Sequence, residues 1–198
     1  LGNKTVLQHS LDLLLSVSQI EGVVLVLSEN DLAQYQHLSS ERLRLASGGK
    51  LRQDSVANGL GLVPNTASWV LIHDAARPFL NESIIEDTFA AAKINGAAVA
   101  GVPVNDTIKM VGSDGCVSKT VDRSLLYQSQ TPQIFSKQLL LQAFKFAHQQ
   151  QLQVTDEAML MEACGIKVGI GKGHPHNFKI TTPSDYQLAQ YILLGKSQ

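Results

Sequence analysis

An aspartate and an arginine follow directly on a short apolar segment near the middle of the chain. The segment WVLI, residues 69–72, is rich in β-formers and continues as HDAARP, so Asp74 comes where a buried strand should end and Arg77 follows three residues later. A carboxylate accepts hydrogen bonds from hydroxyl groups or metal-bound water, and a guanidinium binds phosphate. The pair predicts a site for a hydroxylated, phosphorylated ligand. The structural alternative is an ion pair that caps the sheet edge.

A glycine pair precedes a predicted helix in SGGKLRQDSV, residues 47–56. Gly48 and Gly49 would let backbone N–H groups approach a ligand closely, and Arg52 and Ser55 would lie at the positive end of the helix. These features suit a nucleotide base or phosphate. An ordinary Gly-Gly turn is the alternative.

A lysine lies in NFKIT, residues 177–181, after the loop GKGHPH. Lys179 is predicted near the end of a strand, although a lone lysine is usually a solvated surface charge. His174 and His176 are interpreted as loop residues rather than metal ligands. Because ligands of open parallel sheets bind beyond the carboxyl ends of the strands, these three loops are the first candidates for a ligand site.

Helical and strand-like patterns alternate along the chain, which predicts an α/β fold with a mostly parallel sheet covered on both faces, in a single domain over residues 1–198. The predicted helices fall at residues 5–16, 31–38, 52–60, 81–96, 136–149, 156–164 and 183–194, and the strands at 23–27, 43–46, 69–72, 97–104 and 166–171.

The alternation of helices and strands breaks between Thr107 and Asp122, where TIKMVGSDGCVSKTVD alternates polar with apolar residues around a Ser-Asp-Gly turn. This pattern predicts a projecting β-hairpin, called the arm below, over about residues 105–124. An isolated hairpin is marginal in water and leaves its apolar residues exposed. A second subunit, in a homodimer, is the simplest way to cover them.

Composition excludes several classes of partner. Lys and Arg total 16 against 17 Asp and Glu, a net charge of -1, and no basic stripe suited to nucleic acid is present. Apolar segments have the length of strands, so no membrane segment is predicted, and no signal peptide pattern is found. The two cysteines, Cys116 and Cys164, fit reduced thiols in a cytoplasmic protein.

Seven motifs occur in an order that resembles one enzyme family over nearly the whole chain. That family comprises the cytidylyltransferases that act on 2-C-methyl-D-erythritol 4-phosphate in the non-mevalonate isoprenoid pathway. The motifs are SGG followed by R-x-D-S-V, HDAARPF, P-x-N-D-T-I-K, TVDR, QTPQIF, TDEA and NFKITTP-x-D. The related ribitol-5-phosphate cytidylyltransferases usually carry a bulkier residue where this chain has Ala76, which favours methylerythritol phosphate as the acceptor.

The resemblance implies a Rossmann-like nucleotidyltransferase fold and a reaction of CTP with the acceptor phosphate that releases pyrophosphate, with Mg²⁺ on the triphosphate. By resemblance Lys179 would stand by the reacting phosphates, and Asp74 and Arg77 would hold the polyol end of the acceptor. Arg123 and Thr107 would reach from the arm into the neighbouring subunit to hold the acceptor phosphate. The remaining implied site residues are Gly48, Gly49, Arg52 and Ser55 for the nucleotide and Thr155 for the acceptor pocket.

Two departures from the family pattern stand out. Lys50 occupies a position where some members have an acidic residue, so it receives no base-reading role. The family's first strand and its glycine-rich triphosphate loop are absent before Leu1, and roughly 25–35 further residues are expected upstream. Without them the alternative is a non-catalytic nucleotide- or sugar-phosphate-binding homologue. A dinucleotide-dependent oxidoreductase ranks lower, because GLGLVP does not match G-x-G-x-x-G.

Overall fold

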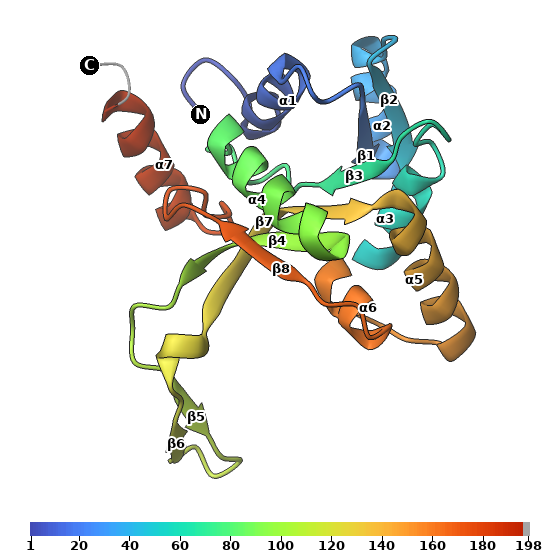
Figure 1. Ribbon diagram of the computed structural model, residues 1–198. Coiled ribbons are helices and arrows are strands. Elements are labelled where there is room, and N and C mark those ends of the chain that lie inside the picture. The colour runs from blue at the N-terminus through green and yellow to red at the C-terminus, as the bar shows by residue number, and fades with distance from the viewer. Residues whose placement is uncertain (196–198) are drawn as a thin grey trace.

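A computed structural model describes residues 1–195 as an α/β body from which the arm projects (Figure 1). The helices are α1 (Val6–Ser16), α2 (Glu29–Tyr35), α3 (Arg52–Leu60), α4 (Glu82–Asn95), α5 (Lys137–Gln150), α6 (Glu157–Ala163) and α7 (Pro183–Gly195), with 3-10 turns η1 (Gln36–Leu38) and η2 (Arg123–Leu125). The strands are β1 (Val23–Leu27), β2 (Leu43–Ser47), β3 (Trp69–Ile72), β4 (Ala97–Pro103), β5 (Lys109–Val111), β6 (Val117–Thr120), β7 (Tyr127–Ser136) and β8 (Gly169–Lys172).

The strands of the body form two sheets. Strands β1 and β2 pair in parallel, and a four-stranded sheet has the order β3-β7-β4-β8. In the larger sheet β4 and β8 are parallel, whereas β7 runs antiparallel to both of its neighbours, so this sheet is mixed. Sequence analysis did not assign β7 as a strand, because Gln130, Thr131 and Gln133 interrupt its apolar pattern. All three are buried in the fold.

Helices cover both faces of the four-stranded sheet, as the apolar patterns predicted. Ala98 of β4 and Ile134 of β7 pack in one core cluster with residues of α4. Their neighbours Ala97 and Phe135 face the opposite side, in a cluster with residues of α5 and α6. Because successive residues of a strand point to opposite faces, this division holds β4 and β7 between two helical layers. The loops at their ends are thereby placed on a rigid support.

Helix α4 begins and ends at the predicted capping residues. The Asn81 side chain accepts a hydrogen bond from the Ile84 N–H at 3.0 Å, and Gly96 ends the helix with φ +83°. Glycine tolerates this left-handed conformation, which other residues rarely adopt. In the layer that α4 forms, a Cβ on Gly171 of β8 would lie 2.4 Å from the Thr88 Cα, so the helix and strand approach each other more closely than a side chain would allow.

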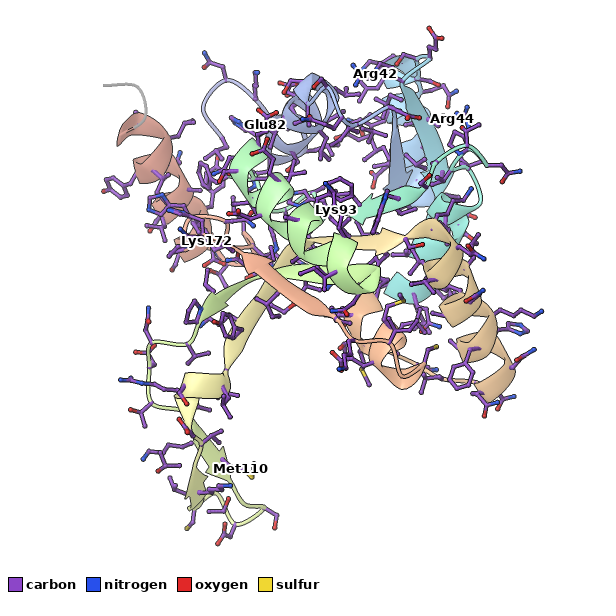
Figure 2. The ribbon with its side chains drawn as sticks, viewed as in Figure 1. Arg42, Arg44, Glu82, Lys93, Met110 and Lys172 are labelled. Atoms are coloured by element: carbon purple, nitrogen blue, oxygen red, sulfur yellow. The ribbon has the colours of Figure 1, made fainter. Side chains whose placement is uncertain are left out.

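The predicted arm is present as the antiparallel hairpin β5–β6, which projects away from the body (Figure 1). Met110, which is labelled in Figure 2, lies on this hairpin. The apolar side chains of Met110, Val111 and Val117 are 55, 56 and 60% exposed. Within residues 1–195, none of the helices has both the length and the apolar character needed to cross a membrane.

Candidate active site

Three segments that are far apart in the sequence converge on the carboxylate of Asp74. The loop after β3 carries Asp74 and Arg77, the first turn of α3 carries Arg52, and the segment before α7 carries Lys179. A carboxylate oxygen of Asp74 lies 3.3 Å from Lys179 Nζ, 3.5 Å from Arg77 Nε and 3.9 Å from Arg52 Nη2. Four of the residues that the sequence predicted are thus brought together, as three cations around one anion.

These cations keep Asp74 ionised in a site that is largely withdrawn from water. Burial of the side chain would raise the pKa of Asp74, but Lys179, Arg52 and Arg77 outweigh burial and lower that pKa below its ordinary value. Three positive groups against this one carboxylate leave a surplus of positive charge. Such a surplus suits a ligand that carries phosphate groups.

Arg77 is anchored to the segment that carries Lys179. Its Nη1 donates a hydrogen bond to the Asn177 carbonyl at 2.8 Å, and the Ile180 N–H donates to the Ala76 carbonyl at 2.9 Å. Burial lowers the pKa of Arg77, and the carboxylate of Asp74 opposes that shift. The loop after β3 and the segment around Lys179 are therefore held together as one unit, with both cations facing Asp74.

Arg52 is held from the other side by a buried carboxylate that the sequence analysis did not single out. Its Nη1 lies 2.7 Å from each carboxylate oxygen of Glu157, and the Glu157 side chain is 1% exposed. Burial raises the pKa of Glu157, and the charge of Arg52 opposes that rise. Arg52 therefore bridges two carboxylates, one in the core and one at the site.

The glycine loop is closed by hydrogen bonds within itself. The Gly49 N–H donates to Ser55 Oγ at 3.0 Å, and the Ser55 hydroxyl donates to the Leu51 carbonyl at 3.1 Å. A Cβ on Gly49 would lie 2.2 Å from the Cβ of Asp54, so this backbone path requires glycine. Gly48 is held beside β1, since its N–H donates to the Leu27 carbonyl at 2.7 Å.

Three further predicted residues, Thr155, Thr107 and Arg123, lie outside both the Asp74 cluster and the glycine loop. Thr155 lies just before α6, exposed, and its hydroxyl faces Met159 Sδ at 3.8 Å. Thr107 and Arg123 are exposed on the arm, where the Arg123 guanidinium donates to the Asn105 carbonyl. Both residues belong to the arm, which projects away from the body (Figure 1).

An open cavity of about 780 Å³ lies between the base of the arm and the body. Arg77 and Lys179 line it, so the cluster around Asp74 borders on this cavity. Apolar side chains of Tyr127, Ile170 and Phe178 form another part of its wall. The cavity therefore combines phosphate-binding cations with an apolar surface close to the arm.

Four buried or partly buried residues that were not selected from the sequence support the site residues. They are Glu157, the buried Thr131 and Asn177, and the partly buried His73. Glu157 resembles an ordinary acidic residue in the first turn of a helix, a common position because negative charge is favourable there. Its partner is 105 residues away in the sequence, so no local pattern could reveal it.

A metal centre built from side chains is not found among residues 1–195, in which no three His, Cys, Asp or Glu side chains are grouped to hold an ion. The carboxylate of Asp74 is already paired with three cations. The described residues therefore do not fit a metal site of their own, and any divalent ion would depend on ligands that the substrate supplies.

Comparison with known proteins gives one consistent result. The family model of 2-C-methyl-D-erythritol 4-phosphate cytidylyltransferase matches residues 1–195. A protein of that name from Mannheimia succiniciproducens is 38% identical over 195 residues, which cover 98% of this chain and 85% of the relative. Another from Dehalococcoides mccartyi is 39% identical over 198 residues, covering 98 and 86% of the two chains.

Solved structures agree with the sequence comparison. The 4-diphosphocytidyl-2C-methyl-D-erythritol synthase of Anaerococcus prevotii superposes with a TM-score of 0.91 at 30% identity, covering 98% of this chain and 91% of that one. The 2-C-methyl-D-erythritol 4-phosphate cytidylyltransferase of Thermus thermophilus gives a TM-score of 0.82 at 30% identity, covering 97 and 90%. The predicted nucleotidyltransferase fold is confirmed.

Proposed function

The chain belongs to the 2-C-methyl-D-erythritol 4-phosphate cytidylyltransferase family and catalyses CTP-dependent cytidylyl transfer to that acceptor, and we propose how its residues divide this work. The observation that carries the assignment of roles is the ring of Lys179, Arg77 and Arg52 around Asp74. The ring lies on loops that follow β2 and β3 and on the segment that follows β8. The ribitol phosphate alternative is not favoured by the relatives, which are named for methylerythritol phosphate.

The reaction needs positive charge more than it needs a base. An oxygen of the acceptor phosphate attacks the α-phosphorus of CTP, the new P–O bond forms, and the bond to the β-phosphate breaks so that pyrophosphate leaves with the electron pair. The second pKa of a phosphate ester is about 6, so the attacking group is mostly dianionic at neutral pH and no side chain has to remove a proton. The protein must position two anions and stabilise the charge that moves to the leaving group.

Lys179 takes the role of stabilising the reacting phosphates. Its side chain is 45% exposed and its ammonium group lies 3.3 Å from Asp74, so it is oriented by one carboxylate and still open to a ligand. Asp74 and Arg77 bind the acceptor, the carboxylate through hydroxyl groups and the guanidinium through its charge. Thr155 adds a hydroxyl to the acceptor pocket.

The nucleotide binds over the glycine loop. Gly48 and Gly49 bring backbone close to the base, Ser55 supports that loop through its bond with the Gly49 N–H, and Arg52 contributes charge at the first turn of α3. A helix N-terminus favours anions through its free N–H groups and its dipole. The arrangement supports a site in which the base lies over the glycines and the phosphates lie toward Asp74.

The active unit is a homodimer in which Thr107 and Arg123 act across the interface. The exposed apolar side chains of the arm, including Val117 at 60% exposure, and of Leu125 just after it, support a second copy as the surface that covers them. The cavity at the base of the arm has the cations and the apolar wall that an incoming arm and an acceptor phosphate would meet. Arg123 of one subunit would then bind the acceptor phosphate in the site of its partner.

A divalent ion and a reducing compartment complete the proposal. Because the described residues form no metal site of their own, Mg²⁺ would be held chiefly by the triphosphate, and it would supply positive charge that offsets the phosphates beside Lys179, Arg77 and Arg52. Two free cysteines, Cys116 and Cys164, support a cytoplasmic location.

The test is pyrophosphate release by the full-length gene product with Mg²⁺, each of the four nucleoside triphosphates and a panel of polyol phosphates. CTP with 2-C-methyl-D-erythritol 4-phosphate should give the highest kcat/KM, and ribitol 5-phosphate should be a poor acceptor. Faster turnover with ribitol 5-phosphate, or binding without turnover for every pair, would overturn the assignment.

A further inference from the structure

His73 lies directly before the loop that carries Asp74 and Arg77 and has no role in the scheme above. It follows the last residue of β3 and directly precedes Asp74. Each ring nitrogen faces a polar atom: Nδ1 lies 3.0 Å from Thr131 Oγ1, and Nε2 lies 3.2 Å from the Arg77 carbonyl oxygen. The imidazole therefore spans the turn from one side.

The partners of the ring determine which nitrogen carries the proton. A carbonyl oxygen can only accept, so Nε2 must donate to Arg77. In the neutral ring Nδ1 is then an acceptor, and the Thr131 hydroxyl donates to it. The same Thr131 oxygen accepts from the Asp74 N–H at 3.0 Å, so donors and acceptors alternate along the whole chain of bonds.

The electrostatic surroundings agree with this neutral form. Burial lowers the pKa of His73 to about 4, although the Arg77 carbonyl and the charge of Asp74 both oppose that shift. Protonation at Nδ1 would also turn the Thr131 hydroxyl hydrogen away from its acceptor. At neutral pH the ring is therefore uncharged, with its hydrogen on Nε2.

The chain of bonds ends in the rigid part of the sheet. Thr131 lies in β7, 4% exposed, and its carbonyl accepts from the buried Asn177 side chain at 2.8 Å. At the other end the Arg77 N–H donates to the Asp74 carbonyl at 3.0 Å and closes the turn. The Asp74 N–H is tied to Thr131 of β7 directly, and His73 ties the Arg77 carbonyl to the same Thr131 hydroxyl.

We propose that His73 is a positioning residue, which sets the Asp74–Arg77 turn so that the Asp74 carboxylate faces both the Arg77 guanidinium and Lys179. It acts through the backbone N–H of Asp74, by way of Thr131, and through the Arg77 carbonyl directly. The catalytic consequence rests on the proposed function, whereas the tautomer and the bonds do not. Misplacing a binding group by about 1 Å can cost on the order of 10²-fold in rate.

Three variants separate the contributions of the ring. His73→Phe keeps its size and removes both bonds, His73→Asn can still accept from Thr131, and His73→Gln can still donate to the Arg77 carbonyl. We expect His73→Phe to lower kcat/KM for the acceptor about 10- to 100-fold, with the KM for CTP unchanged and smaller losses in the two amide variants. His148→Phe, at an exposed histidine of α5, is the matched control and should have wild-type kinetics.

Nuclear magnetic resonance of the ring gives a readout that needs no turnover. Long-range proton–nitrogen correlations, assigned by the loss of one ring in His73→Asn, should show hydrogen on Nε2 and a bare Nδ1 at neutral pH. A bare Nε2, or a doubly protonated ring at that pH, would overturn the proposal even if the enzyme is active.

The kinetic outcomes are equally separable. If His73→Phe has wild-type kinetics with the acceptor, the positioning role is refuted. It is also refuted if kcat/KM falls equally for CTP and for the acceptor and the melting temperature of the variant falls in parallel. If the wild-type protein itself transfers no cytidylyl group, the proposed function fails. The role of His73 is then decided by its tautomer and by the affinity of the variants for the acceptor, measured by calorimetry.

Discussion

The guanidinium of Arg52 lies between two carboxylates of different character, 2.7 Å from both oxygens of the buried Glu157 and 3.9 Å from Asp74. The contact with Glu157 fixes where the side chain of Arg52 can point. The longer contact leaves Nη2 available to a phosphate at the edge of the site. The core of the protein thus supports a cation that the ligand is proposed to use.

Removing either partner of this pair should have unequal effects on stability. Arg52→Ala leaves a buried, uncompensated carboxylate and should lower the free energy of unfolding by up to about 3–5 kcal/mol at neutral pH. Glu157→Gln leaves Arg52, 36% exposed, in contact with water and should cost less, about 1.5–3 kcal/mol. Urea unfolding of both variants measures the difference.

The two variants should also differ in their response to pH. The folded-state pKa of Glu157 is raised, and in Arg52→Ala the opposing charge is gone. The loss of unfolding free energy caused by Arg52→Ala is therefore largest above the pKa of Glu157. It decreases as pH falls through that pKa, because the carboxyl group is then protonated. Arg52→Ala should approach the wild type as pH falls through the raised pKa of Glu157, whereas Glu157→Gln should not. Equal losses in both variants at pH 5 and 7 would contradict this account.

Lys179→Ala should lower kcat rather than raise KM. The ammonium group is proposed to act on oxygens whose charge changes as pyrophosphate leaves, so the loss should be about 10²–10³-fold, as for one preorganised donor elsewhere. Steady-state kinetics with both substrates varied separates the two parameters. Lys145→Ala, at an exposed position of α5, is the control. An unchanged kcat with a raised KM would make Lys179 a binding residue instead.

Arg123→Ala should weaken binding of the acceptor and leave binding of CTP unchanged. A hydrogen bond to a charged group contributes about 1.5–3 kcal/mol, and the loss should appear in the KM for methylerythritol phosphate. Calorimetric titration of each substrate checks the assignment. Collapse of CTP binding with intact acceptor binding would assign Arg123 to the nucleotide.

Mixed dimers test whether Arg123 acts across the interface. With the acceptor far below its KM, Arg123→Ala and Lys179→Ala chains are each nearly inactive alone. After random mixing they should recover about a quarter of wild-type activity, because half of the dimers are mixed and each has one intact site of two. If Arg123 serves its own chain, no mixed dimer has an intact site and no activity returns. Sedimentation of Met110→Asp, expected to be more monomeric, checks the arm itself.

His73 should make the protein sensitive to mild acid. The pKa of His73 is about 4 in the folded state and 6.5 in the unfolded state. Its contribution to the free energy of unfolding is therefore fully present above pH 6.5 and is lost as pH falls toward 4. At about 1.36 kcal/mol for each pKa unit, that loss is up to about 3 kcal/mol. Asp74 and Arg77 face the ring with opposing effects. The free energy of unfolding should therefore change less with pH in His73→Phe than in the wild type. Urea unfolding of both proteins at pH 4.5, 5.5 and 7 measures the difference.

The positions of helices and strands followed from local patterns in most of the chain. Asn81 and Gly96 bound α4 as predicted, and the polar–apolar alternation on both sides of a turn located the arm. The ends of α4 and the position of the arm depend on residues that are close in the sequence, because capping, turn conformation and side-chain periodicity act over a few residues. The loop residues Asp74 and Arg52 could be selected because each follows a strand that the pattern identified.

Long-range contacts decided the rest. Strand β7 was missed because its buried glutamines and threonine are satisfied by distant groups, such as Asp156, which accepts from the Gln133 side chain at 2.9 Å. The sequence determined that cations and a carboxylate would lie at strand ends, since residue type and spacing specify the loops. Only the tertiary structure decided that Glu157 supports Arg52 and that His73 faces Thr131, because a buried ion pair or hydrogen bond depends on which surfaces pack together.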